Sequence, residues 1–246
     1  MRKVFFLCLF MSQTLVQATE LTVSAAASLT QAFQEIGMLF EKQHPDTKLR
    51  LNFGASGALL QQIANGAPVD VFASADTDTM DKAVSKGVVV ATDVKVFTHN
   101  KLVLISPMRS TLAVMQLSDL KKPDIKRIAM GSPTSVPAGH YAQEVLEKLG
   151  LWSELKDKVI QTSNVRQALD YVSRDEVDLG FVYASDALLM QDKVKVMFQV
   201  QTTTPIQYAI AKVNSSPQTD TANKFIAYLQ ASSAQVVLRK YGFGNR

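Results

Sequence analysis

Small polar residues recur at four points where a strand-like run of the sequence gives way to a helix-like run. The turns read AAASLT (25–30), NFGASGALL (52–60), MGSPTSVPAGHYA (130–142) and QTSNVRQAL (161–169). Each places Ser, Asn, Gly or Ala where the first backbone N–H groups of a helix lack an acceptor within the helix. Because such groups attract anions, the turns predict either ordinary helix caps or a site for a small, electron-rich ligand.

Taken one at a time, each turn favours a helix cap, because Ser and Asn are among the commonest residues at that position. Taken together, the turns favour a binding site. Ligands of open α/β sheets bind beyond the carboxyl ends of the strands, where all four turns would lie. A pocket of hydroxyls and backbone N–H groups without lysines suits a fully ionised oxyanion that must be released again.

Strands and helices must position these turns, and the sequence alternates the two. Strand-like runs are expected at 21–27, 48–53, 69–75, 101–106, 125–131, 158–163, 177–184, 194–200 and 206–213. Helical periods are expected at 29–40, 58–64, 80–87, 140–150, 165–175 and over most of 221–243. The alternation predicts mostly parallel sheets with helices on both faces, and 246 residues suit two lobes of about 100 residues each.

Residues 1–18 predict a cleaved export signal, and hence an exported protein. Arg2 and Lys3 precede an apolar run at 4–11 that is too short to span a bilayer, and Val16 and Ala18 supply small residues for a cleavage site. Cleavage after Ala18 would remove Cys8, the one cysteine of the chain. A secreted chain without thiols fits an oxidising compartment.

Composition and charge argue against several partners. Hydrophobic residues make up 47% of the chain and charged residues 20%, as in ordinary folded proteins, and the net charge is +4. Acidic and basic residues are interspersed, so nucleic acid is not an expected partner. His44, His99 and His140 are scattered along the chain and do not predict a site for a metal cation.

Six segments resemble the periplasmic molybdate-binding proteins of ABC import systems. They are AAASLTQAF, FGASGALLQQIANGAPVDVFASAD, GSPTSVPAGHYAQEVLEKLG, NVRQALDYV, LGFVYASDA and LRKYGF. The resemblance runs in order through nearly all of the chain after residue 18. The VPAG-x-YA and VYxSDA segments are its most specific parts.

The resemblance implies the class II periplasmic binding protein fold, an α/β fold of two lobes. Residues 19–98 and 209–246 would form one lobe, residues 99–208 the other, and crossover strands near 98–104 and 204–210 the hinge. Molybdate or tungstate would bind between the lobes as cargo, with no cofactor. The closed protein, a monomer and not an enzyme, would dock on an inner-membrane permease powered by an ATPase.

The family's ligand contacts carry over to Ser28, Ser56, Ala138, Val165 and Tyr183. The two serines would donate hydroxyl and backbone hydrogen bonds, Ala138 and Val165 backbone N–H groups, and Tyr183 its phenol. Molybdenum would be held only as the oxyanion, without direct cation ligands. Two motifs depart from the family: GASG stands where consecutive serines are common, and GSP lacks an acidic residue before its proline.

Two alternatives stay open at this point. Sulfate is also a proton-free tetrahedral dianion, and a sequence does not give the radius of a cavity. A serine hydrolase using Ser56 is the other, because GASGA resembles a nucleophile elbow, although Ala58 stands where the last glycine of G-x-S-x-G is needed. Among the charged residues near the turns, Arg166 is expected to be solvated, and Asp70, Asp76 and Asp186 to cap helices or pack between lobes.

Overall fold

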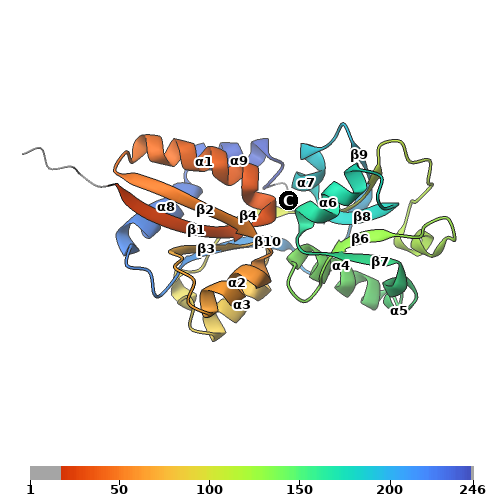
Figure 1. The fold of residues 1–246 in the computed structure, drawn as a ribbon, viewed down its shortest axis with the longest axis horizontal. Helices are drawn as coiled ribbons and strands as arrows, with labels where there is room; N and C mark the ends of the chain where they lie inside the picture. Colours follow the sequence, from red (N-terminus) through yellow and green to blue (C-terminus); the bar gives the residue numbers. More distant parts are fainter. Residues whose placement is uncertain (1–17, 245–246) are drawn as a thin grey trace, which may run out of the picture.

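The computed structural model describes residues 18–244, which form two lobes side by side (Figure 1). Residues 1–17 of the expected signal peptide lie outside the described residues. Each lobe is built on one five-stranded sheet flanked by helices. The expectation of a two-lobed α/β fold is confirmed.

The sheet of the first lobe has the strand order β2-β1-β3-β10-β4. Its members are β1 (Thr19–Ala26), β2 (Thr47–Gly54), β3 (Val71–Ser74), β4 (Lys95–Asn100) and β10 (Ile206–Lys212). β1 pairs in parallel with β2 and β3, whereas β10 runs antiparallel to β3 and β4. Four strands therefore point the same way, and the carboxyl ends of β1, β2 and β3 lie at one end of the sheet.

Helices cover both faces of this sheet. On one side lie α1 (Thr30–Gln43), α8 (Thr219–Gln230) and α9 (Ser232–Lys240), and on the other α2 (Ser56–Ala64) and α3 (Thr77–Ser85) (Figure 1). Val71 and Ala73 of β3 join the large core cluster that includes α1 and α8, whereas Phe72 packs with Leu59 and Met80 of α2 and α3. Alternate side chains of a strand point to opposite faces, so this apolar strand is buried on both.

The second lobe repeats the plan with the strand order β7-β6-β8-β5-β9. Its members are β5 (Leu102–Pro107), β6 (Ile128–Gly131), β7 (Val159–Thr162), β8 (Leu179–Tyr183) and β9 (Val194–Val200). β6 is parallel to β7 and β8, and β5 is antiparallel to β8 and β9. Its helices are α4 (Pro137–Lys148), α5 (Trp152–Leu155), α6 (Val165–Ser173) and α7 (Ala184–Leu189).

Short 3₁₀ helices complete the described elements. They are η1 (Ala27–Leu29), η2 (Ala91–Asp93), η3 (Leu117–Lys121) and η4 (Lys156–Lys158). The helical stretch expected within 221–243 is two helices, because Ala231 between α8 and α9 is extended (φ −71°, ψ 151°). The Gln235 amide donates to the Leu229 carbonyl at 2.7 Å and so satisfies the end of α8. No helix of residues 18–244 is both long and apolar enough to cross a membrane.

The chain crosses between the lobes at two neighbouring points. β4 ends at Asn100 and β5 begins at Leu102, while β9 ends at Val200 and β10 begins at Ile206. Asn100 faces Ile206 in one sheet, and Leu102 faces Val200 in the other. The lobe boundaries expected at 98/99 and 208/209 fall inside β4 and β10, because both strands stay in the first sheet and the chain changes sheet at 101 and 201–205.

Candidate functional site

The four polar turns meet at one small pocket between the lobes. Its empty volume is about 200 Å³ when the open solvent at its mouth is included, and its enclosed space is only about 10 Å³. It lies beyond the carboxyl ends of β1 and β2 in one lobe and of β6, β7 and β8 in the other. The lining residues are Ala26, Ala27, Ser28, Gly54, Ala55, Ser56, Ala75, Val136, Pro137, Ala138, Asn164, Val165 and Tyr183.

All five residues predicted for the site line this pocket. Ser28 lies in η1, Ser56 is the first residue of α2, and Ala138 is the second residue of α4. Val165 opens α6, and Tyr183 ends β8. The structure therefore brings together, from both lobes, residues that are up to 155 positions apart, here counted from Ser28 to Tyr183.

Three of the helix starts at the pocket have no side-chain cap. Their N-cap residues are Ala26 before η1, Ala55 before α2 and Val136 before α4, none of which caps its helix with a side-chain hydrogen bond. Since Ser, Thr, Asp and Asn are preferred at this position, apolar caps leave the first N–H groups without a side-chain acceptor from the cap. The fourth start, α6, is capped by Asn164, whose Oδ1 accepts from the Gln167 backbone N–H at 3.0 Å.

The Ser56 hydroxyl is oriented as a donor. Its Oγ accepts a 3.1 Å hydrogen bond from the backbone N–H of Ala75. The hydroxyl proton is therefore left to donate elsewhere, and Ser56 is fully buried at the pocket wall. A ligand with acceptor oxygens is the natural partner of that proton.

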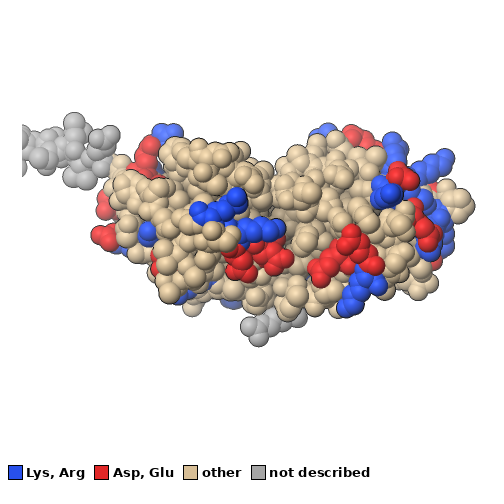
Figure 2. Space-filling view, turned by 90° about the horizontal axis from the view of Figure 1, so that it is seen from below, with Lys and Arg blue, Asp and Glu red and all other residues tan. Residues whose placement is uncertain are grey.

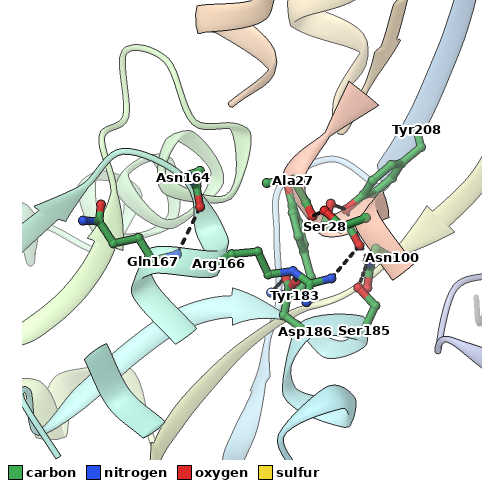
Figure 3. A network of polar contacts seen from close by, with 11 residues as sticks. Ala27, Ser28, Asn100, Asn164, Arg166, Gln167, Tyr183, Ser185, Asp186 and Tyr208 are labelled. Carbon is green, nitrogen blue, oxygen red and sulfur yellow. Dashed lines mark hydrogen bonds and ion pairs between the residues drawn. The ribbon is translucent and has the colours of Figure 1, made fainter. Parts of the chain in front are cut away.

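The Ser28 hydroxyl is oriented by residues of the two crossing strands. Its Oγ lies 2.9 Å from the Tyr208 hydroxyl, which accepts from Asn100 Nδ2 at 3.3 Å (Figure 3). Burial raises the pKa of the Tyr208 phenol well above its ordinary value, so this hydroxyl keeps its proton. Either hydroxyl can be the donor of the bond between Ser28 and Tyr208; when Tyr208 donates, the Ser28 proton is free to point into the pocket.

The Tyr183 hydroxyl is buried at the pocket, and no group in the described part of the chain is its hydrogen-bond partner. Its ring stacks edge-on against Tyr208, with the centroids 5.7 Å apart, so the side chain is held in place. Burial raises the pKa of this phenol well above its ordinary value, so it remains a neutral donor. A buried hydroxyl without a partner is costly, which marks this atom as one that awaits a ligand.

Close backbone packing brings α4 up to the pocket. A Cβ on Gly139 would lie 1.8 Å from the carbonyl oxygen of Gly131 at the end of β6. Only glycine allows this approach, and it sets the N-terminus of α4, with Ala138, against the strand end. The lobes also touch directly, because the Gly57 N–H donates to the Ser135 carbonyl at 3.0 Å.

Among residues 18–244, none of those that line the pocket carries a charge. The nearest charged pair lies beside it, where Arg166 Nε is 2.6 Å from Asp186 Oδ1. The expectation of a solvated Arg166 is wrong, because its side chain is only 18% exposed and reaches the other lobe. The aspartates do have structural roles: Asp76 caps α3, Asp70 accepts from the Thr22 N–H, and Asp186 accepts from the Tyr183 N–H.

A larger groove lies next to the pocket, on the outer side of the contact between the lobes. Its lining residues include Lys82 of α3, Lys86 directly after α3 and His140 of α4. His140 Nε2 lies 3.6 Å from Asp78 Oδ2 of the first lobe. Figure 2 shows charged side chains gathered on either side of the boundary between the lobes, with uncharged residues between them. The groove differs from the pocket in offering ammonium groups.

Sequence reasoning did not identify Asn100 and Tyr208 as part of the site. They lie on β4 and β10, and their contact with Ser28 exists only after the two crossing strands pair. No local pattern could have identified them. Residues 18–244 bring together no group of three or more His, Cys, Asp or Glu side chains suited to a metal cation.

The comparisons with known proteins agree with this architecture. Residues 21–244 match the family model described as bacterial extracellular solute-binding protein. YvgL of Bacillus subtilis, named as a substrate-binding lipoprotein of an ABC transporter, is 40% identical over 91% of this chain and 85% of its own. The molybdate-binding protein ModA of Haemophilus influenzae is 34% identical over 92% of this chain and 90% of its own.

A comparison with a solved structure supports the fold and nothing beyond the fold. The periplasmic molybdate-binding protein of Azotobacter vinelandii superposes with a TM-score of 0.80 at 24% identity, over 92% of this chain and 99% of its own. The family match covers nearly every described residue, and both relatives exceed the identity at which a shared family is secure. The chain therefore belongs to the bacterial extracellular solute-binding protein family.

Proposed function

We propose that the protein binds molybdate or tungstate in the pocket between its lobes and delivers the anion to an ABC permease for import. The observation that carries this proposal is the pocket's composition. It offers hydroxyl donors from Ser28, Ser56 and Tyr183 and helix N–H groups at Ala138 and Val165, with no charged side chain in its lining. The name of the Haemophilus relative supports the choice of anion.

The donor set favours a fully ionised oxyanion. Phosphate keeps a proton near neutrality and needs an acceptor such as a carboxylate, which the pocket lining lacks. Each hydrogen bond to a charged ligand contributes about 1.5–3 kcal/mol, so five donors are sufficient for tight binding after the costs of ordering. Sulfate meets the same requirement of charge and is the second candidate.

Ligand binding would favour the closed arrangement of the lobes. Ser28 and Ser56 belong to the first lobe, and Ala138, Val165 and Tyr183 to the second. An anion that contacts both lobes binds the closed form better than an open one and shifts the equilibrium by that difference. The closed monomer is the form that the permease would receive.

Export and the absence of catalysis complete the proposal. The signal at residues 1–18 would direct the chain to the periplasm, where the anion is captured as cargo without a resident cofactor. A hydrolase is disfavoured because a catalytic serine donates its proton to a histidine, whereas the contact given for the Ser56 hydroxyl among the described residues is with the backbone N–H of Ala75. Esterase turnover abolished by Ser56→Ala would revive that alternative.

A thermal-shift series tests the function. Anion-free protein is heated with molybdate, tungstate, sulfate or phosphate, each over a wide concentration range. A ligand at about 100 times its Kd adds about 2.7 kcal/mol to stability. We expect molybdate and tungstate to raise the melting temperature at the lowest concentrations. A larger effect of sulfate at equal concentration would select the second candidate, and no effect of any of the four would refute oxyanion binding.

A further inference from the structure

Arg166 occupies an unfavourable position for a cation. It is the second residue of α6, where the helix dipole is positive and repels a positive charge. Its side chain is nevertheless only 18% exposed. Losing water at such a position requires specific partners, and the structure shows which groups supply them.

Within its own lobe, Arg166 is held by Asp186. Arg166 Nε lies 2.6 Å from Asp186 Oδ1, and Asp186 is fully buried. The other carboxylate oxygen of Asp186 accepts from the backbone N–H of Tyr183 at 3.2 Å. The ion pair with Asp186 therefore holds the guanidinium and balances its charge within the second lobe.

The far end of the guanidinium reaches across to the first lobe. Arg166 Nη2 donates to the carbonyl oxygen of Ser28 at 2.9 Å (Figure 3). Ser28 is thus held from two sides, because its hydroxyl is fixed by Tyr208 of β10. Asn100 of β4 donates both to Tyr208 and, at 2.8 Å, to Ser185 Oγ of the second lobe. The site serine is connected to both crossing strands and to both lobes.

We propose that Arg166 is a latch, a positioning residue that holds the two lobes closed over the bound anion by binding the Ser28 carbonyl. The inference rests on the proposed function for the nature of the anion. Opening the lobes breaks the bond to Ser28 but leaves the bond to Asp186, since both of those residues lie in the second lobe. The latch is therefore already oriented and desolvated when the lobes meet, and closure gains a charge-assisted hydrogen bond at little cost in entropy.

A latch that forms after the anion has entered changes mainly the rate of anion dissociation. Association precedes closure, so the association rate changes little, whereas dissociation requires the latch to open. The hydrogen bond of a charged donor is strong enough for about a 10- to 100-fold change in a rate. A merely structural role of Arg166 would lower stability without separating the two rates.

The test uses three variants of the full chain. Arg166→Met keeps the length of the side chain without its donors. Arg166→Lys keeps the charge beside Asp186 but lacks the planar fork that reaches two acceptors at once, and it decides the outcome if the Met variant does not fold. Arg174→Met, at the exposed end of the same helix, is the matched control. Stopped-flow mixing and calorimetry with molybdate give both rates and the Kd.

The closed population is measured separately by fluorescence energy transfer. The labels are placed on cysteines introduced at the exposed residues Met38 of the first lobe and Leu149 of the second, in a Cys8→Ser background without other thiols. We expect both Arg166 variants to release molybdate about 10- to 100-fold faster, with association within twofold and a wider label distance at saturation. The Arg174 variant should match the parent protein.

Unchanged release and unchanged label distance in both Arg166 variants would overturn the latch. If the parent protein binds none of the oxyanions, the proposed function fails. The label distance without anion then shows whether Arg166 holds the lobes closed. A smaller closed population in the Arg166 variants would support it under those conditions, and equal populations would overturn it.

Discussion

Removal of the Tyr183 hydroxyl should separate binding from stability. Tyr183→Phe keeps the ring and its contact with Tyr208 but deletes the buried oxygen that lacks a partner. If that hydroxyl donates to an ionised ligand, its loss costs about 1.5–3 kcal/mol of binding free energy. Since each 1.4 kcal/mol is tenfold, the Kd for molybdate should rise about 10- to 150-fold.

The effect on the anion-free protein should have the opposite sign. A buried hydroxyl without a partner costs about 1–3 kcal/mol, and water in the pocket would reduce that cost. The anion-free Phe variant should therefore be at least as stable as the parent. Removing a buried hydroxyl that has a partner in the protein lowers stability. Weaker molybdate binding without a loss of stability in the anion-free protein would therefore indicate that the Tyr183 hydroxyl serves the ligand and not the fold.

Calorimetric titration with molybdate and urea unfolding without it measure the two quantities. Tyr171→Phe is the matched control, because its hydroxyl accepts from Gln167 Nε2 on α6 at 3.2 Å and is not part of the pocket lining. The control should bind molybdate with the parent's affinity. A Tyr183→Phe variant that binds as tightly as the parent, or that is clearly less stable without anion, would refute the reasoning.

Four further substitutions test the site and its support. Ser28→Ala and Ser56→Ala should each weaken molybdate binding by about 1–3 kcal/mol in calorimetry, because each removes an oriented donor; unchanged affinity in both would remove the serines from the site. Gly139→Ala should lower the free energy of unfolding by at least about 1–3 kcal/mol in urea, because its Cβ would meet the Gly131 carbonyl. Burial raises the pKa of Asp76, so its contribution to stability is greatest below the ordinary carboxyl pKa and is lost as the pH rises through the raised value. Asp76→Asn, which can still cap α3, should abolish that pH dependence and raise the melting temperature at pH 7; a lower melting temperature would contradict this.

Much of the fold follows from sequence pattern alone. Strands such as β3 and β8 are continuous apolar runs, and the turns that follow β1, β2, β6 and β7 carry the small and polar residues of helix starts. Local chemistry therefore predicted most of the strands and long helices, although α3 and α4 begin three residues before the expected starts at 80 and 140, and the short helices α5 and α7 were not predicted. It missed β4, whose sequence KVFTHN mixes polar and apolar residues and is stabilised by pairing with β10.

The residues of the candidate site also differ in how far the neighbouring sequence reveals them. The turns that hold Ser28, Ser56, Ala138 and Val165 could be recognised from neighbouring residues. The assignment of these four residues and of Tyr183 to a ligand required the family resemblance. Their partners could not be found locally, because Tyr208 lies 180 positions from Ser28. Arg166 carried a usable signal, since a cation at the start of a helix needs a partner, but the sequence did not say which acidic residue that was.

An anomalous difference map of a crystal grown with molybdate, collected at the molybdenum absorption edge, tests the central claim most directly. We predict one strong peak between the lobes, with the oxygens of the anion within hydrogen-bond distance of the Ser28, Ser56 and Tyr183 hydroxyls and the Ala138 and Val165 N–H groups. A peak in the neighbouring groove beside the ammonium groups of Lys82 and Lys86, with the pocket empty, would contradict the account.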